Sequence, residues 1–193
     1  MRVCWGQPTT ISASYFLRLL QEGSSARAHS YVPMYRFLEN CTLRTVSEYL
    51  KSLGGSYYDS FADMLVFDAL ICNEDRHFGN FGLMVDNKTN QPYAFAPFFD
   101  HGLSLFNYAM PDDIDAMKSL DEYAKTRSSA YGVPFENIVR EFISPRQKEQ
   151  LRKMIGFRFE KHPAYNLPAE RLRAIEKTLQ NRVQAFLSIP DKG

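Results

Sequence analysis

The feature of this sequence that most constrains its fold is an apolar stretch that ends abruptly in a cluster of polar groups. Residues 57–72 are apolar on nearly every side of a helix, a pattern typical of a helix packed deep inside a mainly helical domain. The chain then reads Asn-Glu-Asp-Arg-His-Phe-Gly-Asn over residues 73–80, and the apolar pattern resumes at Phe81. An ordinary solvated turn does not require this combination of acid, base, amide and glycine. The cluster therefore predicts a functional loop at the end of a buried helix.

A second cluster of the same kind follows after a short hairpin. Phe81–Val85 predicts a strand, residues 86–90 a turn and Tyr93–Phe95 the returning strand. The run Phe-Phe-Asp-His-Gly-Leu-Ser over residues 98–104 then places a carboxylate, an imidazole and a glycine directly after apolar residues. We expect the two phenylalanines of this run to lie in the core, and the hairpin to fold the second cluster back beside the first.

The rest of the sequence is predicted to be largely helical. Thr42 is a suitable cap for a helix that ends at Gly54, and Ser144 followed by proline is a good helix start. A long amphipathic helix is predicted to begin near Pro168, whereas residues 112–131 are ambiguous. The fold class is therefore α+β, mostly helical, with a small β-hairpin that carries the active-site loops. We expect one domain over residues 1–193, in which residues 1–40 are the place for a hinge or linker.

Composition excludes several partners and compartments. The 193 residues contain 23 Lys and Arg against 22 Asp and Glu without a basic run, so we expect neither nucleic acid nor a membrane surface as a partner. Polar side chains interrupt the N-terminal residues, so we expect neither a signal peptide nor a membrane span there. Cys4, Cys41 and Cys72 are odd in number and widely spaced, which favours reduced thiols and a cytoplasmic location.

The two clusters supply the groups that phosphoryl transfer from ATP requires. Such a site needs a carboxylate to orient the attacking hydroxyl and accept its proton, and amide or carboxylate oxygens to hold magnesium. Asp75, Asn80 and Asp100 offer these groups. The spacing of Asp75 and Asn80, with four residues between them, matches the catalytic loop of protein kinases. Asp100-His-Gly stands where the magnesium-binding Asp-Phe-Gly motif of those kinases would stand.

Taken together, N-E-D-R-H-F-G-N and F-F-D-H-G closely resemble the HipA-like serine/threonine kinases, bacterial kinases best known as toxins of toxin–antitoxin pairs. Phosphatidylinositol kinases share the D-R-H-x-x-N core. The resemblance covers residues 60–105 strongly and the surrounding helices loosely. It implies the C-terminal lobe of a protein-kinase-like fold, with Mg²⁺ and ATP as cofactors and a serine or threonine hydroxyl of a protein as the substrate. An antitoxin-like protein is an expected partner.

The resemblance also implies roles for individual residues. Asp75 would be the catalytic base or the carboxylate that orients the substrate, and Asn80 and Asp100 would bind magnesium. His77 would belong to the catalytic group and hold the loop by local hydrogen bonds, since an imidazole can both donate and accept.

Four further positions complete these expectations. Asn73 would shape the start of the loop, Arg76 would neutralise phosphate or pair with an acid, and we place both, with Asn80, on the cofactor-binding side. Cys72 departs from the family, which often has glycine there. Asp68, alone in an apolar helix, is expected to be a buried acid paired with an arginine or a structural hydrogen-bond acceptor.

One half of a kinase is missing from the pattern. A nucleotide-binding lobe needs a phosphate-cradling loop and a strand lysine, yet the first lysine is Lys51, inside a predicted helix. We therefore expect weak or absent kinase activity from these 193 residues alone. Either another segment or a partner protein supplies the missing lobe, or the chain is a relative that has lost transfer activity and acts as a non-catalytic interaction module.

A different enzyme class also fits part of the pattern. Asp75, His77, Asp100 and His101 could together ligate a transition metal for hydrolysis. In that arrangement Asn80 would have no task. A tightly held zinc, manganese or iron would favour this hydrolase, whereas a site that requires added magnesium and nucleotide would favour the kinase.

Overall fold

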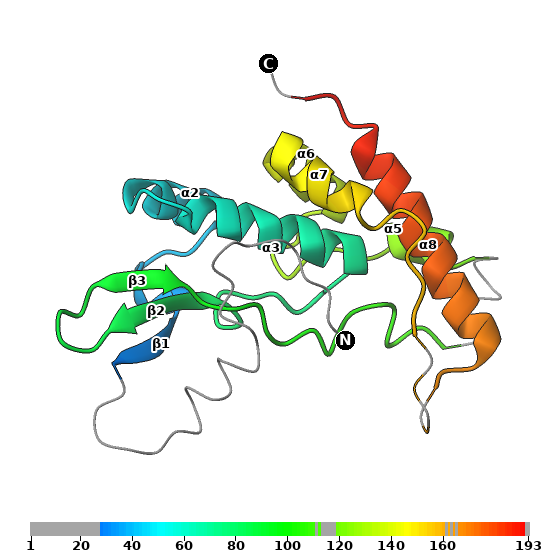
Figure 1. Cartoon of the computed structure of the whole chain (residues 1–193), viewed down its shortest axis with the longest axis horizontal. Coiled ribbons are helices and arrows are strands. Elements are labelled where there is room, and N and C mark those ends of the chain that lie inside the picture. Colours follow the sequence, from blue (N-terminus) through cyan, green and yellow to red (C-terminus); the bar gives the residue numbers. More distant parts are fainter. Residues whose placement is uncertain are drawn as a thin grey trace. The chain divides into compact units, whose positions relative to one another are not determined.

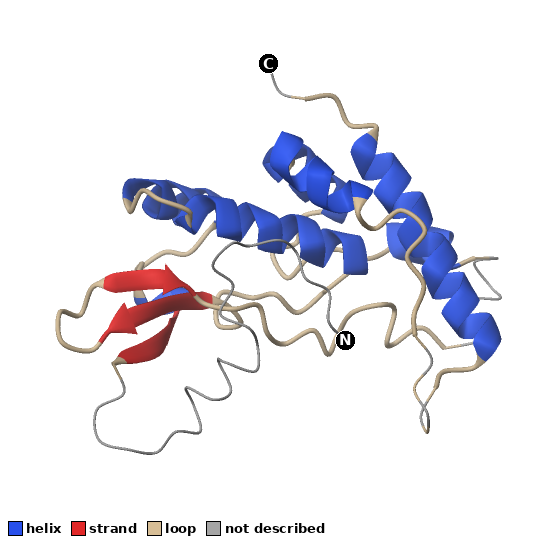
Figure 2. Ribbon diagram, viewed as in Figure 1, coloured by secondary structure: helices blue, strands red, loops and turns tan. Residues whose placement is uncertain are grey.

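The computed structural model of the chain describes residues 28–110, 112, 119–160, 162, 164 and 166–191. These residues form an α+β protein with six α-helices, one short 3-10 helix and a three-stranded antiparallel sheet (Figures 1 and 2), which confirms the predicted class. The chain divides into two compact units. The first unit contains the residues up to Met64 together with 76–100, and the second contains 65–75 together with the residues from His101 onward.

The sheet belongs to the first unit and has the order β1 (His29–Pro33), β2 (Gly82–Asp86) and β3 (Pro92–Phe95). β2 and β3 form the predicted hairpin, whose turn is closed by the Asp86 carboxylate accepting hydrogen bonds from the Lys88 and Thr89 amides. β1 pairs with the other edge of β2 and lies within the range 1–40 that the sequence suggests for a hinge. The 3-10 helix η1 (Met34–Arg36) follows β1 directly.

Helix α2 (Leu43–Ser52) begins and ends where the sequence predicts. The Thr42 hydroxyl accepts a hydrogen bond from the Thr45 amide, and the Thr45 hydroxyl accepts one from the Thr42 amide, so both exposed amides are satisfied. Gly54 and Gly55, both with positive φ, lead the chain out of the helix. These local signals explain why this helix could be predicted from the sequence.

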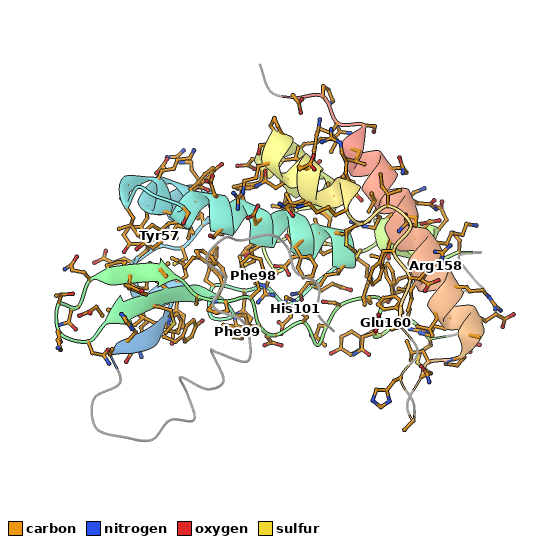
Figure 3. All side chains as sticks on the ribbon, in the orientation of Figure 1. Tyr57, Phe98, Phe99, His101, Arg158 and Glu160 are labelled. Carbon is orange, nitrogen blue, oxygen red and sulfur yellow. The ribbon has the colours of Figure 1, made fainter. Side chains whose placement is uncertain are left out.

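Helix α3 (Tyr57–Ile71) corresponds to the apolar stretch predicted at residues 57–72. Its buried side chains occur on every side of the helix, as expected: Phe61, Ala62, Met64, Leu65, Val66, Ala69, Leu70 and Ile71. At its start, the Tyr57 hydroxyl donates to the Pro92 carbonyl of β3 at 3.1 Å (Figure 3). Tyr57 thereby ties the first turn of α3 to the sheet of the first unit.

The C-terminus of α3 turns into the predicted functional loop through a left-handed residue. Cys72 has φ 52°, its amide donates to the Ala69 carbonyl, and the Asn73 amide donates to the Asp68 carbonyl at 2.9 Å. This pair of bonds is the Schellman arrangement, in which the residue after the helix adopts the conformation that glycine favours. Glycine would fit this position without strain, and Cys72 occupies it instead.

The second unit contains the other helices: α5 (Leu120–Lys125), α6 (Phe135–Phe142), α7 (Pro145–Arg152) and α8 (Ala169–Leu187). Ser144 and Pro168 stand immediately before α7 and α8, as predicted. Part of the ambiguous region at 112–131 forms α5, and residues 113–118 lie outside the described residues.

One further finding concerns burial, and another concerns the length and hydropathy of the helices. Phe98 and Phe99 are half-buried, so the expectation that this pair lies in the core is wrong; the chain has already left the sheet there and approaches the exposed Asp100. Across the part of the chain that the structure describes, no helix combines the length and hydropathy needed to span a bilayer.

Candidate active site

The predicted site residues are distributed over both units. Arg76, His77, Asn80 and Asp100 belong to the first unit, whereas Asn73 and Asp75 belong to the second. The boundary falls at the peptide bond between Asp75 and Arg76. Convergence of Asp75 with Asn80 and Asp100 therefore stays a prediction.

In the first unit, Arg76 connects the two polar clusters. Its side chain is 1% exposed, and the same nitrogen, Nη1, donates to the Asn80 carbonyl at 2.7 Å and to the Phe99 carbonyl at 2.5 Å. One guanidinium thus holds the last residue of the loop next to the residue that precedes Asp100. This contact positions backbone, and the predicted role of Arg76 toward phosphate stays a prediction.

His77 hydrogen-bonds within its own turn. Its Nδ1 accepts a hydrogen bond from the Gly79 amide at 3.0 Å, and its carbonyl accepts one from the Asn80 amide at 2.9 Å. A Cβ at Gly79 would lie 2.9 Å from the imidazole, so glycine gives the ring its room. These contacts stabilise the tight turn that presents Asn80, and the catalytic role of His77 stays a prediction.

Residues of β1 and η1, which the sequence alone does not identify, anchor this loop. The Tyr31 hydroxyl donates to the Gly79 carbonyl at 3.1 Å. The Met34 amide donates to the Phe81 carbonyl at 2.9 Å, and the Tyr35 amide donates to the Phe78 carbonyl at 3.2 Å. Burial raises the pKa of Tyr31 to about 12, and the positive charge of Arg76 opposes this shift, so the phenol keeps its proton. The extended pattern of residues 30–34 was the available signal, but pairing between distant strands cannot be derived from it.

The donor chemistry of Asn80 and Asp100 fits magnesium. Asp100 is exposed with φ 56°, and Asn80 is half-buried. Arg76 holds the Asn80 carbonyl beside the carbonyl of Phe99, the residue before Asp100, so one amide oxygen and one carboxylate come from neighbouring backbone segments. Magnesium prefers such hard oxygen ligands and takes the remaining ones from phosphate and water. Within the described ranges no three His, Cys, Asp or Glu side chains are gathered around a common point.

In the second unit, the backbone amide of Asp75 is hydrogen-bonded to the side chain of Asn73. The Asp75 amide donates to Asn73 Oδ1 at 3.2 Å, and Asn73 Nδ2 donates to Asp68 Oδ1 at 2.9 Å. Asn73 is fully buried, whereas Asp75 is partly exposed. Asn73 thus shapes the start of the loop as expected, and its predicted contact with the cofactor stays a prediction.

The segment after Asp100 runs beside the start of the loop in the second unit. The Glu74 amide donates to the Leu103 carbonyl at 3.2 Å, and the Leu105 amide donates to the Ile71 carbonyl at 2.8 Å. The Glu74 carboxylate lies 3.6 Å from Arg127; burial raises the pKa of Glu74, and Arg127 opposes that effect. The loop that presents Asp75 is therefore fixed to its neighbour by backbone bonds.

The two cysteines in the described residues are free thiols. Cys72 is buried, and burial raises the pKa of its thiol to about 11, so the thiol stays protonated at neutral pH. Cys41 is half-buried, and Cys4 lies outside the described residues. Cys72 is thus a packing residue beside the site.

Comparison with known proteins gives a distant similarity to a kinase. No protein-family model matches the chain. Serine/threonine-protein kinase CtkA of Helicobacter pylori is 36% identical over 74 residues, which are 38% of this chain and only 22% of that protein. The crystal structure described as an H. pylori proinflammatory kinase CtkA gives a TM-score of 0.47 at 16% identity, with 84% of this chain and 68% of that chain covered, a likeness too weak to support an argument. The chain is thus distantly similar in sequence to a serine/threonine kinase.

Proposed function

We propose that this chain is the catalytic-loop lobe of a HipA-like protein kinase, which transfers the γ-phosphoryl group of magnesium-bound ATP to a serine or threonine hydroxyl of a protein. The observation that carries the proposal is the Arg76 guanidinium, which joins the carbonyls of Asn80 and Phe99. Two motifs that are distant in sequence are thereby held together within the first unit, and a kinase needs metal ligands from two such motifs. The local similarity to CtkA supports the same class.

Each proposed role matches the chemistry of its side chain. The carboxylate of Asp75 orients the attacking hydroxyl and takes its proton as the new oxygen–phosphorus bond forms and the bond to the β-phosphate oxygen breaks. Asn80 and Asp100 would hold magnesium, which when bound neutralises charge on the phosphates. Arg76, His77 and Asn73 keep the loop in place through the contacts described above.

Substitution of the two carboxylates tests this proposal. In an assembly that contains the nucleotide-binding lobe, Asp75→Asn and Asp100→Asn should each lower phosphoryl transfer by about 100-fold or more, because the first removes the proton acceptor and the second a magnesium ligand. Transfer of radiolabelled phosphate from ATP to protein measures the effect, and circular dichroism shows that the fold is kept.

Asp59→Asn is the matched control, because Asp59 is an exposed carboxylate in the first turn of α3. This variant should transfer phosphate at the rate of the unmodified chain. Transfer that survives both Asp75→Asn and Asp100→Asn would refute the assignment.

One observation favours a second candidate, a non-catalytic interaction module. The first lysine of the chain, Lys51, lies on α2 with its Nζ 4.4 Å from the centre of the Tyr58 ring, and not on a strand where it could pair with phosphates. If isothermal titration shows no binding of magnesium and ATP even when the missing lobe is supplied, and a specific protein partner binds instead, the module is the better description.

A further inference from the structure

The geometry points to Asp68 as the residue that positions Asp75, acting through Asn73 as a hydrogen-bond relay. Asp68 is 3% exposed and lies five residues before Asn73, where the loop begins. A buried carboxylate is costly unless its oxygens receive hydrogen bonds, so a site that keeps one depends on its partners. This inference rests on the proposed function only in making Asp75 the reacting carboxylate.

The relay follows from the planarity of the Asn73 amide. Its Nδ2 donates to Asp68 Oδ1 at 2.9 Å, and its Oδ1 accepts from the Asp75 amide at 3.2 Å. Because nitrogen and oxygen belong to one planar group, the bond to Asp68 also decides where the acceptor for Asp75 points. With Asp68 absent, the Asn73 amide could flip or rotate and leave the Asp75 amide without this acceptor.

Two contacts show that Asp68 serves more than one segment. The Asn73 backbone amide donates to the Asp68 carbonyl, so the side chain and the main chain of Asp68 both fix the same residue. His101, labelled in Figure 3, has its Nδ1 3.9 Å from the same Oδ1, and its ring lies nearly perpendicular to that of Phe67, with the ring centres 5.5 Å apart. His101 is the first residue after Asp100, so Asp68 stands between the starts of two functional segments of the second unit.

A purely structural role would predict a different result from a positioning role. If Asp68 only stabilises the fold, its loss should accelerate hydrogen exchange across the whole second unit. If it positions Asp75, the loss should act first on the Asp75 amide and spare amides that lie outside the relay, such as those in the middle of α8.

The test exchanges donor and acceptor without changing side-chain volume. Asn73→Asp places two carboxylates against each other, so the Asp75 amide of the full chain should exchange at least about tenfold faster in hydrogen-exchange NMR. Asp68→Asn replaces a charged acceptor with a neutral one and should have a smaller effect in the same direction. The double variant Asp68→Asn, Asn73→Asp lets residue 68 donate to residue 73 and should return the exchange rate toward that of the unmodified chain.

The matched control is a similar pair far from the loop in sequence. Asn181 Nδ2 donates to Asp121 Oδ2 at 2.8 Å on the surface of the second unit, so Asn181→Asp breaks the same kind of bond and should leave Asp75 exchange unchanged. If Asn73→Asp does not fold, Asp68→Asn and the double variant still decide the question. If Asp68→Asn leaves the exchange rate of the Asp75 amide unchanged, and the double variant does not return that rate to the value of the unmodified chain, the inference is overturned.

The exchange experiment does not depend on phosphoryl transfer. In the complete assembly, Asn73→Asp should also lower kcat while the KM for ATP stays unchanged, and the double variant should recover part of kcat. A relay that behaves as expected, in a complete assembly that neither binds ATP nor transfers its phosphate, would overturn the proposed function alone. Transfer that is normal in all three variants, with unchanged Asp75 exchange, would overturn the inference alone.

Discussion

Among single residues, Cys72 stands out because it occupies a backbone position that glycine normally fills. Its φ of 52° ends α3, while its side chain is only 1% exposed. Most residues other than glycine, asparagine and aspartate find this region unfavourable by about 1–2 kcal/mol. The protein therefore tolerates local strain at the start of its loop in exchange for a buried thiol.

Cys72→Val should destabilise the protein by about 2 kcal/mol, because a β-branched side chain is strongly disfavoured at positive φ. Urea unfolding followed by circular dichroism measures this. Cys72→Gly is the control: relief of strain and loss of the buried side chain act in opposite directions, so its free energy of unfolding should stay within about 1 kcal/mol of the unmodified chain. Equal effects of valine and glycine would contradict the strain account.

At the scale of elements, the pairing of β1 with β2 depends on the absence of a side chain at Gly82. A Cβ there would lie 2.1 Å from the Val32 carbonyl and 2.8 Å from the Pro33 Cα, both backbone atoms that cannot rotate away. The strand that anchors the loop through Tyr31 therefore approaches β2 closely at this point.

Gly82→Ala should cost at least about 2 kcal/mol of unfolding free energy, because β1 must shift to make room. It should also increase hydrogen exchange of the amides of β1. Ser30→Ala, at an exposed position of the same strand, should change stability by less than about 0.5 kcal/mol. A stable Gly82→Ala variant with normal exchange in β1 would show that the register has more freedom than the structure indicates.

Helix α8 supports the end of α3 through one buried arginine of the second unit. Arg182 donates through Nη2 to the Ala69 carbonyl at 2.7 Å, approaches Glu136 at 3.3 Å and lies over the Phe186 ring. The last carbonyls of a helix lack their usual partner within it. The Ala69 carbonyl accepts only a long bond, 3.4 Å, from the Cys72 amide of the backbone, and Arg182 adds a charged donor.

Arg182→Met should destabilise the protein by about 2–3 kcal/mol, since methionine keeps the apolar stem but leaves the Ala69 carbonyl without its charged donor. Thermal and urea unfolding measure the loss. Arg173→Met, at an exposed position of the same helix, controls for the change in charge and should be close to neutral. A loss of stability of equal size in both variants would mean that the change in net charge causes it, and not the lost contact at the C-terminus of α3.

Which elements could be predicted from the sequence follows from the range of the forces that form them. Caps, apolar periodicity and turn residues are local, so α2, α3, α7, α8 and the β2–β3 hairpin were predicted. β1 was not identified as a strand, because its partner β2 lies about fifty residues later in the sequence. In the site, residue types and spacing identified the candidates, whereas the carbonyls that Arg76 contacts depend on the complete fold.

For the whole molecule, the proposed roles fall on residues of both units, and the strands of the described residues carry no lysine for the nucleotide phosphates. Asn80 and Asp100 lie in the first unit and Asp75 in the second. No lysine precedes Lys51, and a kinase relies on a strand lysine to pair with the α- and β-phosphates. Metal ligands alone hold nucleotide weakly, because magnesium takes most of its ligands from phosphate and water.

The 193 residues alone should therefore show weak or undetectable ATP turnover. Isothermal titration with magnesium and ATP should give a dissociation constant on the order of millimolar, and radiolabelled phosphate transfer should rise when a nucleotide-binding lobe is added in trans. The Asp100→Asn variant is the control, since it should bind no better with magnesium than without. Robust turnover by the pure chain, abolished by Asp75→Asn, would instead mean that these residues contain a complete nucleotide site and that the missing lobe is not needed.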